Sequence, residues 1–150
     1  MYQRRNRMKM KLFFSVAIIS LPFVSSGVAA PEGFMCPSPE EINTYINTHI
    51  PTHPGELVTL PGPLGGKWQS WTSPAFNYKV SSLYTVYIEN NNSITCIFST
   101  EGGDSPNFHM TLKTSGLVKA VEGGSWGRGN ICIADRDLNK CKFEEIKPHD

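Results

Sequence analysis

Long apolar runs are almost absent from this sequence, and the one that exists lies near its start. Leu12–Val24 is apolar except for Ser15, Ser20 and Pro22, and no later stretch approaches its length. A transmembrane helix needs about 20 apolar residues, so we expect no membrane association once this segment is removed. At 150 residues the chain is also too short for a TIM barrel, a complete α/β-hydrolase or a protein kinase, and it suits one domain.

Charge is also scarce, and it is divided unevenly along the chain. Charged residues make up 18% of the sequence and hydrophobic residues 39%, which supports a modest core. Five of the 14 Lys and Arg residues precede Leu12, whereas all 13 Asp and Glu residues follow Ala29. The chain after Ala29 therefore has a net charge of −4. Such a mildly acidic domain is a poor candidate for binding nucleic acid or anionic lipid.

The first residues are typical of a secretory signal peptide. Basic residues in 4–11 precede the apolar run, and small residues follow it in 25–30, which is the order of the three regions of such a signal. Cleavage after Ala30 would leave Pro31 next to the scissile bond, where its fixed φ angle and missing N–H suit a peptidase poorly. We therefore expect a signal peptide at 1–29 and a single exported domain, periplasmic or secreted, at 30–150.

The exported part contains four cysteines, Cys36, Cys96, Cys132 and Cys141. In an oxidising compartment an even number predicts two disulfides, for which three pairings are possible. Local context favours Cys36–Cys96, which would join a helix to an apolar strand, and Cys132–Cys141, which would close a polar loop. No C-x-x-C pair is present, which argues against the alternative of a zinc site. We expect no metal and no cofactor.

One helix is predicted near the start of the exported domain. Ser38 can cap its N-terminus, Pro39 suits the first helical position, and Glu41 can complete a capping box. Apolar and aromatic residues recur at helical spacing over 42–49, and Pro51 ends the pattern. His49 and His53 have the spacing of a metal-binding pair on a helix, but Pro51 lies between them, so we treat this pair as incidental.

Short strands dominate the rest of the chain. Their expected ranges are 57–60, 67–72, 83–89, 93–100, 108–113, 117–121, 130–133 and 142–146. Asn90–Asn92 would join two of them, because asparagine tolerates the left-handed conformation of tight hairpins. Phe108, Met110 and Leu112 alternate with polar residues, which places His109 on the polar side of its strand. The sum predicts an α+β domain with one N-terminal helix packed on an antiparallel β meander, held by two disulfides.

Several short motifs follow one another in a definite order. They are a signal peptide, Cys36-Pro37 before a short helix, Gly66-Lys67-Trp68 in a strand, Cys96 in a central strand, a lone Trp126 and a closing Cys141-Lys142-Phe143. This order resembles the small exported proteins of intracellular gram-negative bacteria that are grouped only as a domain of unknown function. The resemblance covers 36–143, nearly all of the exported domain. It implies a disulfide-bonded exported domain without an assigned activity, and it brings no functional residue with it.

One segment matches a catalytic motif letter for letter. Gly123–Gly127 fits G-x-S-x-G, with Ser125 in the position of the nucleophile. This motif needs a strand before the serine and a helix after it, whereas 127–130 contains two glycines that would break a helix. The one later histidine, His149, is next to last in the chain. We therefore expect a glycine-rich turn and no enzymatic activity, with a small hydrolase using Ser125 as the alternative.

Aromatic residues near turns are the remaining functional signal. If the strand is extended, Trp68 and Trp71 lie on opposite faces. Exposed aromatic side chains can stack on sugar rings or anchor a protein partner, although in a small β domain they more often fill the core. Core packing is favoured for Trp68 and Trp126, and Trp71 is balanced between core and surface. The candidate binding residues are Trp71, Tyr78 and Trp126.

These observations predict a non-enzymatic exported domain that binds a protein or glycan partner. A secreted enzyme inhibitor that acts through one of the loops rich in glycine and proline is a further alternative. The burial of Trp71 and the surroundings of Ser125 distinguish the binding domain from the hydrolase.

Overall fold

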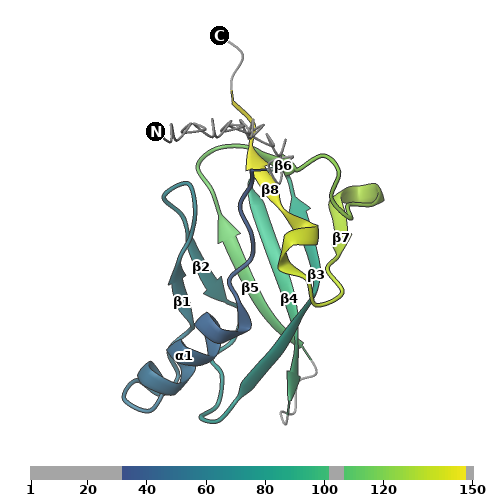
Figure 1. Ribbon diagram of the computed structural model, residues 1–150. Helices are drawn as coiled ribbons and strands as arrows, with labels where there is room; N and C mark the ends of the chain where they lie inside the picture. The colour runs from purple at the N-terminus through teal and green to yellow at the C-terminus, as the bar shows by residue number, and fades with distance from the viewer. Residues whose placement is uncertain (1–31, 102–106, 148–150) are drawn as a thin grey trace, which may run out of the picture.

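The computed structural model of the chain describes residues 32–101 and 107–147. One N-terminal helix packs on an antiparallel sheet of six strands, and a second sheet has two strands (Figure 1). Two disulfides join the parts. This confirms the predicted α+β class. The predicted signal peptide, most of the turn after Glu101 and His149 lie outside the described residues.

The helix and the strands follow one another with short connections. Their bounds are α1 Pro39–His49, β1 Thr59–Pro61, β2 Lys67–Ser70, β3 Lys79–Glu89, β4 Ser93–Glu101, β5 Asn107–Lys113, β6 Val118–Ala120, β7 Ile131–Ile133 and β8 Phe143–Glu145. Two 3-10 turns, Arg128–Asn130 and Leu138–Cys141, precede β7 and β8. Each predicted strand corresponds to an observed one.

The largest difference in strand bounds is at β3, which begins at Lys79 and not at Leu83. Contacts distant in sequence extend it. The Asn43 side chain donates to the Val80 carbonyl at 2.8 Å and accepts from the Val80 N–H at 2.8 Å. The Lys79 ammonium lies 2.7 Å from the Glu101 carboxylate on β4. The start of β3 is therefore fixed by α1 and by β4, which local sequence does not reveal.

The predicted capping box forms at the start of α1. The Ser38 hydroxyl accepts from the Glu41 N–H at 3.2 Å, and the Glu41 carboxylate accepts from the Ser38 N–H at 2.7 Å. Such a cap satisfies backbone donors that the first helical turn leaves without partners. Ile42 and Ile46 lie one turn apart on the buried face of the helix, so α1 is docked on the sheet by its apolar stripe.

The six-stranded sheet has the order β1-β2-β5-β4-β3-β7, and every neighbouring pair is antiparallel. Strands β3, β4 and β5 form the predicted meander. The β1–β2 hairpin lies beside β5, and β7 returns to pair with the free edge of β3. The same six strands therefore bring β2 and β5, which are far apart in the chain, into direct contact.

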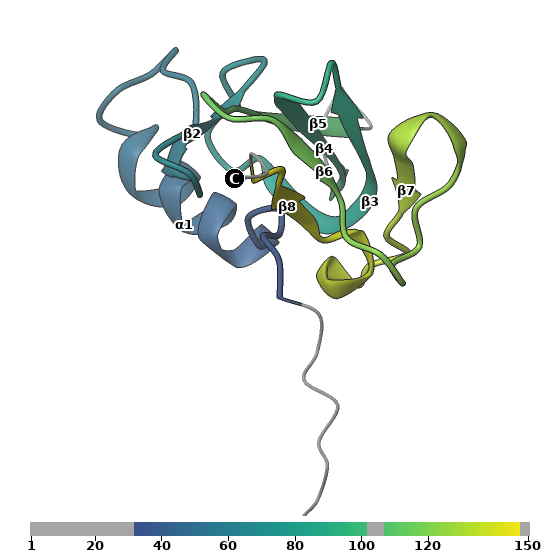
Figure 2. The ribbon, with the colours of Figure 1, turned by 90° about the horizontal axis from the view of Figure 1, so that it is seen from above.

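The core lies between this sheet and a second layer made of α1 and the β6–β8 sheet (Figure 2). Its largest fully buried side chains are Trp68, Phe98, Phe143, Ile42, Ile46, Leu83, Ile94, Met110 and Leu112. Trp68 and Phe143 contact each other edge to face, with ring centroids 6.3 Å apart. Since Trp68 belongs to β2 and Phe143 to β8, this contact joins the two layers.

The two disulfides have the predicted pairing. Cys36 bonds to Cys96 and ties the segment before α1 to the central strand β4. Cys132 bonds to Cys141 and closes the loop between β7 and the last 3-10 turn. Two disulfides indicate an oxidising compartment outside the cytoplasm. Within the described ranges, no helix is long and apolar enough to cross a membrane.

The opposite side of the six-stranded sheet is here called the outer face. Figure 2 shows α1 and β8 on one side of the sheet and no described helix or strand over the other. Side chains alternate along each strand, so the residues next to core positions point outward. The outer face carries Lys67, Gln69, Trp71, Thr85, Tyr87, Glu89, Ser93, Thr95, Ile97, His109, Thr111, Lys113, Ile131 and Ile133.

Candidate functional site

Trp71 is the most conspicuous residue of the outer face, because its indole is exposed and yet fixed in place. The side chain is 56% exposed. Its backbone N–H donates to the His109 carbonyl at 3.2 Å, which continues the pairing of β2 with β5 by one residue. Its indole N–H donates to the Thr111 hydroxyl at 2.6 Å, and that hydroxyl lies 3.0 Å from the Thr95 hydroxyl. The ring is therefore held in one orientation while its face remains in contact with solvent.

The imidazole of His109 supports the Trp71 ring from β5. The two ring centroids are 4.4 Å apart and the planes are tilted by 44°. Burial lowers the pKa of His109 below its usual value. Among the described residues, no group forms a hydrogen bond with its buried Nδ1 atom. Protonation would place charge next to this buried nitrogen, so folding favours the neutral imidazole, which acts as a packing surface for the indole.

A cavity of about 540 Å³ lies beside Trp71. Its lining residues are Leu57, Lys67, Gln69, Ser70, Trp71, Thr111 and Lys113. Lys67, Gln69 and Trp71 are two residues apart on an extended segment and therefore project on the same side. The cavity thus combines one aromatic face with amide, hydroxyl and ammonium groups. Such a set of groups can bind a ligand that has both apolar ring faces and polar substituents.

The three candidate binding residues do not form one site. The Tyr78 ring lies 5.7 Å from the ring of Phe108, which is a core residue. Because Phe108 and His109 are neighbours on one strand, Tyr78 and Trp71 lie on opposite sides of the sheet. Trp126 is half-buried beside β7, and its indole N–H donates to the Lys142 carbonyl at 2.8 Å. Of the three, only Trp71 presents its ring on the outer face.

The residues that surround Trp71 are not among those predicted from the sequence. Lys67 and Gln69 alternate with Trp68 and precede Trp71 on the same side, and this spacing is visible in the sequence. Lys113 and Thr111 reach the cavity only because β2 pairs with β5. The prediction that His109 lies on the polar side of its strand is confirmed, but its contact with Trp71 also depends on that pairing.

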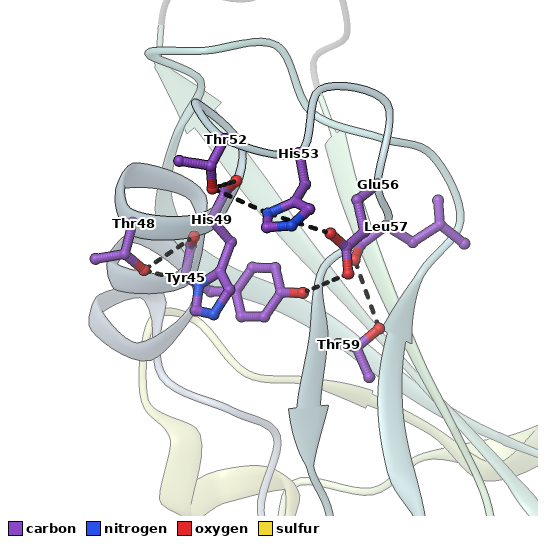
Figure 3. Close-up of polar contacts among 8 residues, drawn as sticks. All are labelled: Tyr45, Thr48, His49, Thr52, His53, Glu56, Leu57 and Thr59. Carbon is purple, nitrogen blue, oxygen red and sulfur yellow. Dashed lines mark hydrogen bonds and ion pairs between the residues drawn. The ribbon is translucent and has the colours of Figure 1, made fainter.

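A second cavity, of about 690 Å³, lies between α1 and β1. At the end of α1 the rings of Tyr45 and His49 are stacked, with centroids 4.1 Å apart (Figure 3). The Tyr45 hydroxyl donates to the Glu56 carboxylate at 3.3 Å. Burial and the charge of Glu56 raise the pKa of Tyr45. These contacts tie the end of the helix to the loop that follows it, which is a structural role.

The two histidines near this cavity make separate contacts. The Nδ1 atom of His49 lies 2.8 Å from the Thr48 hydroxyl, and that of His53 lies 2.9 Å from the Thr52 hydroxyl (Figure 3). His53 also lies 4.0 Å from Glu56. In the part of the chain that the structure describes, no group of three or more His, Cys, Asp or Glu residues is placed to hold a metal ion.

Ser125 lies in an exposed turn between β6 and the first 3-10 turn. Its backbone N–H donates to the Lys140 carbonyl at 2.9 Å. The small cavity beside it, of about 210 Å³, is lined by Asp137, Asn139, Lys140 and Lys142 and by residues of the turn itself. No histidine is among the described residues that line it. A short 3-10 turn follows the glycines, where the nucleophile motif requires a helix.

Comparison of the chain with protein-family models, with curated proteins and with solved structures gives no match. The resemblance to a family of exported proteins stays a prediction.

Replacing His109 should make the stability of the domain less sensitive to acid. The folded state lowers the pKa of His109 below the usual value of about 6.5, so the neutral form is favoured on folding. The stabilisation is present above the unfolded pKa and is lost as the pH falls through the lower folded pKa. We expect the melting temperature of His109→Gln to fall less than that of the original protein when the pH is lowered from about 7 to about 5.

Thermal unfolding at a series of pH values measures this effect, and only the slopes are compared, since the substitution also changes packing. The matched control is Thr111→Val, which changes the packing beside Trp71 and removes no titratable group. This control should keep the acid sensitivity of the original protein. Equal slopes for His109→Gln and the original protein would contradict the assignment of a buried neutral imidazole.

Proposed function

We propose that this chain is an exported, non-enzymatic, disulfide-bonded domain that binds a partner through the outer face of its sheet, with Trp71 at the centre of the site. The observation that carries the proposal is an indole that is 56% exposed and is held by Thr111 and His109. A side chain fixed before binding loses little conformational entropy when the partner arrives. Aromatic residues of this kind are enriched among those that dominate binding energy.

A glycan suits the surroundings of Trp71 better than a protein does. The apolar face of a sugar ring can stack on the indole, while its hydroxyl groups need hydrogen-bond partners close by. The cavity beside Trp71 supplies such partners from Lys67, Gln69 and Lys113. The dominant residues of a protein interface are instead surrounded by contacts that exclude water. The polar, open cavity therefore favours a glycan.

A protein partner is the second candidate, and a different part of the outer face favours it. Ile131 and Ile133 on β7 are 47% and 52% exposed. They lie opposite Tyr87 and Thr85 of β3, at the far end of the outer face from Trp71. Exposed apolar side chains that lie together are a feature of protein interfaces. An enzyme inhibitor would be one form of such a protein-binding domain.

Trp71→Ala should weaken binding of a glycan by about 2 kcal/mol or more, which is roughly 30-fold in affinity. The melting temperature should stay close to that of the original protein, because substitutions at exposed positions usually change stability by about 0.5 kcal/mol or less. A glycan array probed with the disulfide-bonded exported protein selects the ligand. Titration calorimetry with that ligand then compares the variants.

The matched control is Phe76→Ala, since Phe76 is 60% exposed and lines a different hollow, with Pro51 and Pro74. This variant should bind as the original protein does. Unchanged binding by Trp71→Ala would contradict the proposed site.

Ser125→Ala tests the alternative of a hydrolase. Loss of a hydrolytic activity in that variant, with the fold intact, would overturn the non-enzymatic assignment.

A further inference from the structure

Two lysines lie opposite each other beside Trp71. The antiparallel register that pairs Trp68 with Leu112 also places Lys67 of β2 opposite Lys113 of β5. Both side chains are exposed, and both line the cavity beside Trp71. Like charges directly opposite each other on neighbouring strands destabilise a sheet. The pair therefore destabilises the sheet slightly, which indicates a role in binding and not in stability.

Three other lysines of the domain are paired with carboxylates. Their ion pairs are Lys79–Glu101 at 2.7 Å, Lys119–Glu144 at 3.1 Å and Lys140–Asp135 at 3.5 Å. Among the residues that the structure describes, 32–101 and 107–147, neither Lys67 nor Lys113 has such an ion pair. The same row of paired residues continues from Lys113 on β5 through Ser93 on β4 to Glu89 on β3. Glu89 is the acidic residue of this row, and it lies two strands from Lys113, about 10 Å away.

The charge of the lysine pair is opposite in sign to the net charge of the exported chain. The exported chain has a net charge of −4, so acidic groups are in excess over basic ones. An uncompensated pair of ammonium groups on such a chain creates a local positive potential at one cavity. An anionic group of a ligand that enters this cavity would remove the repulsion between Lys67 and Lys113 and would gain attraction from both.

We propose that the outer face binds an acidic oligosaccharide, one that carries carboxylate or sulfate groups. This inference rests on the glycan binding proposed above and assigns the chemistry of the glycan. Lys67 and Trp71 are four residues apart on one extended segment, a distance of about 13 Å. That length suits a short oligosaccharide, with one ring stacked on Trp71 and the acidic group of another between Lys67 and Lys113. Gln69, between them, faces the hydroxyl groups.

Titration calorimetry on the disulfide-bonded exported protein tests this with matched probes. They are a hexagalacturonate, its methyl ester and a heparin hexasaccharide. We expect an acidic probe to bind, with an affinity that falls as salt is added, because exposed charges are screened. The methyl ester keeps the rings but removes the charge, and it should bind about ten-fold more weakly. Binding of galacturonate identifies carboxylate as the recognised group, and binding of heparin alone identifies sulfate.

Substitution of the lysines assigns this preference to the cavity. Lys67→Gln and Lys113→Gln should each weaken binding of the acidic probe by about three- to five-fold, and the double variant by about ten-fold or more. Binding of the methyl ester should not change in these variants. The matched control is Lys79→Gln, which changes the net charge equally but removes an ammonium that is paired with Glu101 on neighbouring strands. This control should bind the acidic probe normally.

Different results would overturn the acidic chemistry of the ligand, the assigned cavity and glycan binding itself. If ester and acid bind equally, and Trp71→Ala abolishes both, acidic recognition is overturned and glycan binding stands. If Lys79→Gln weakens binding as much as Lys67→Gln does, the effect is one of net charge and the assigned cavity is overturned. If no sugar binds at millimolar concentration and a hexapeptide of Asp and Glu does, a glycan ligand is overturned in favour of an acidic peptide.

Discussion

Removal of the Cys36–Cys96 disulfide should lower the free energy of unfolding by about 4 kcal/mol, because this bond closes a long loop in the unfolded chain. The two cysteines are 60 residues apart. The Cys132–Cys141 bond spans only 9 residues, and its removal should cost about 2.5 kcal/mol by the same argument. Since small domains are stable by only about 5–15 kcal/mol, the first loss is a large part of the total.

Urea unfolding of two double variants measures the difference. Cys36→Ala with Cys96→Ala removes the long loop, and Cys132→Ala with Cys141→Ala removes the short one. All four side chains are buried, so the packing lost on substitution is similar in the two variants, and the loop length is what distinguishes them. A larger loss of stability in the second variant would show that local strain, and not chain entropy, controls the contribution of the bonds.

Most elements of this fold could be predicted because they depend mainly on neighbours in the sequence. The capping box at Ser38 and the helical spacing up to His49 determine α1 without help from the rest of the chain. The alternation around Met110 in β5 determines which side of that strand is buried. The pairing of the cysteines followed from their places, since Cys36 precedes the only α-helix of the described residues and Cys96 lies on an apolar strand.

The order of the strands could not be predicted in the same way. A meander would continue from β2 to β3, but β2 pairs with β5. Loop 71–78 is long enough to carry the chain across the sheet, and its sequence does not say where it leads. The second sheet depends on pairing between β6 and β8, which are three residues long each. Such short strands are defined by their partners and by the core that they cover.

Of the residues in the candidate site, only Trp71 was predicted from the sequence. Trp71 is three positions after Trp68, so one of the two had to face outward if the strand was extended. The sequence did not show which face would be buried, and the packing of Trp68 against Phe143 decides it. The lysine pair and the support from His109 both arise from the contact between β2 and β5. They could not be found before that contact was known.

Trp68→Ala should therefore have the opposite consequence from Trp71→Ala, although the two residues belong to one short segment. Trp68 is 2% exposed and its indole contacts Phe143 edge to face, so its truncation leaves a large cavity between the two layers. The expected loss is about 3–5 kcal/mol of unfolding free energy. Trp71→Ala should lose about 0.5 kcal/mol or less, because its side chain is 56% exposed on the surface.

Urea unfolding of both variants, monitored by circular dichroism, tests this contrast. Trp68→Phe is the second variant, because it keeps an aromatic ring in the core and should lose clearly less stability than Trp68→Ala. At low temperature, where Trp68→Phe is folded, its affinity for an acidic oligosaccharide should equal that of the original protein. A weakened affinity in folded Trp68→Phe would mean that the inner side of β2 also shapes the site. A Trp71→Ala variant less stable than Trp68→Ala would overturn the assignment of the two faces.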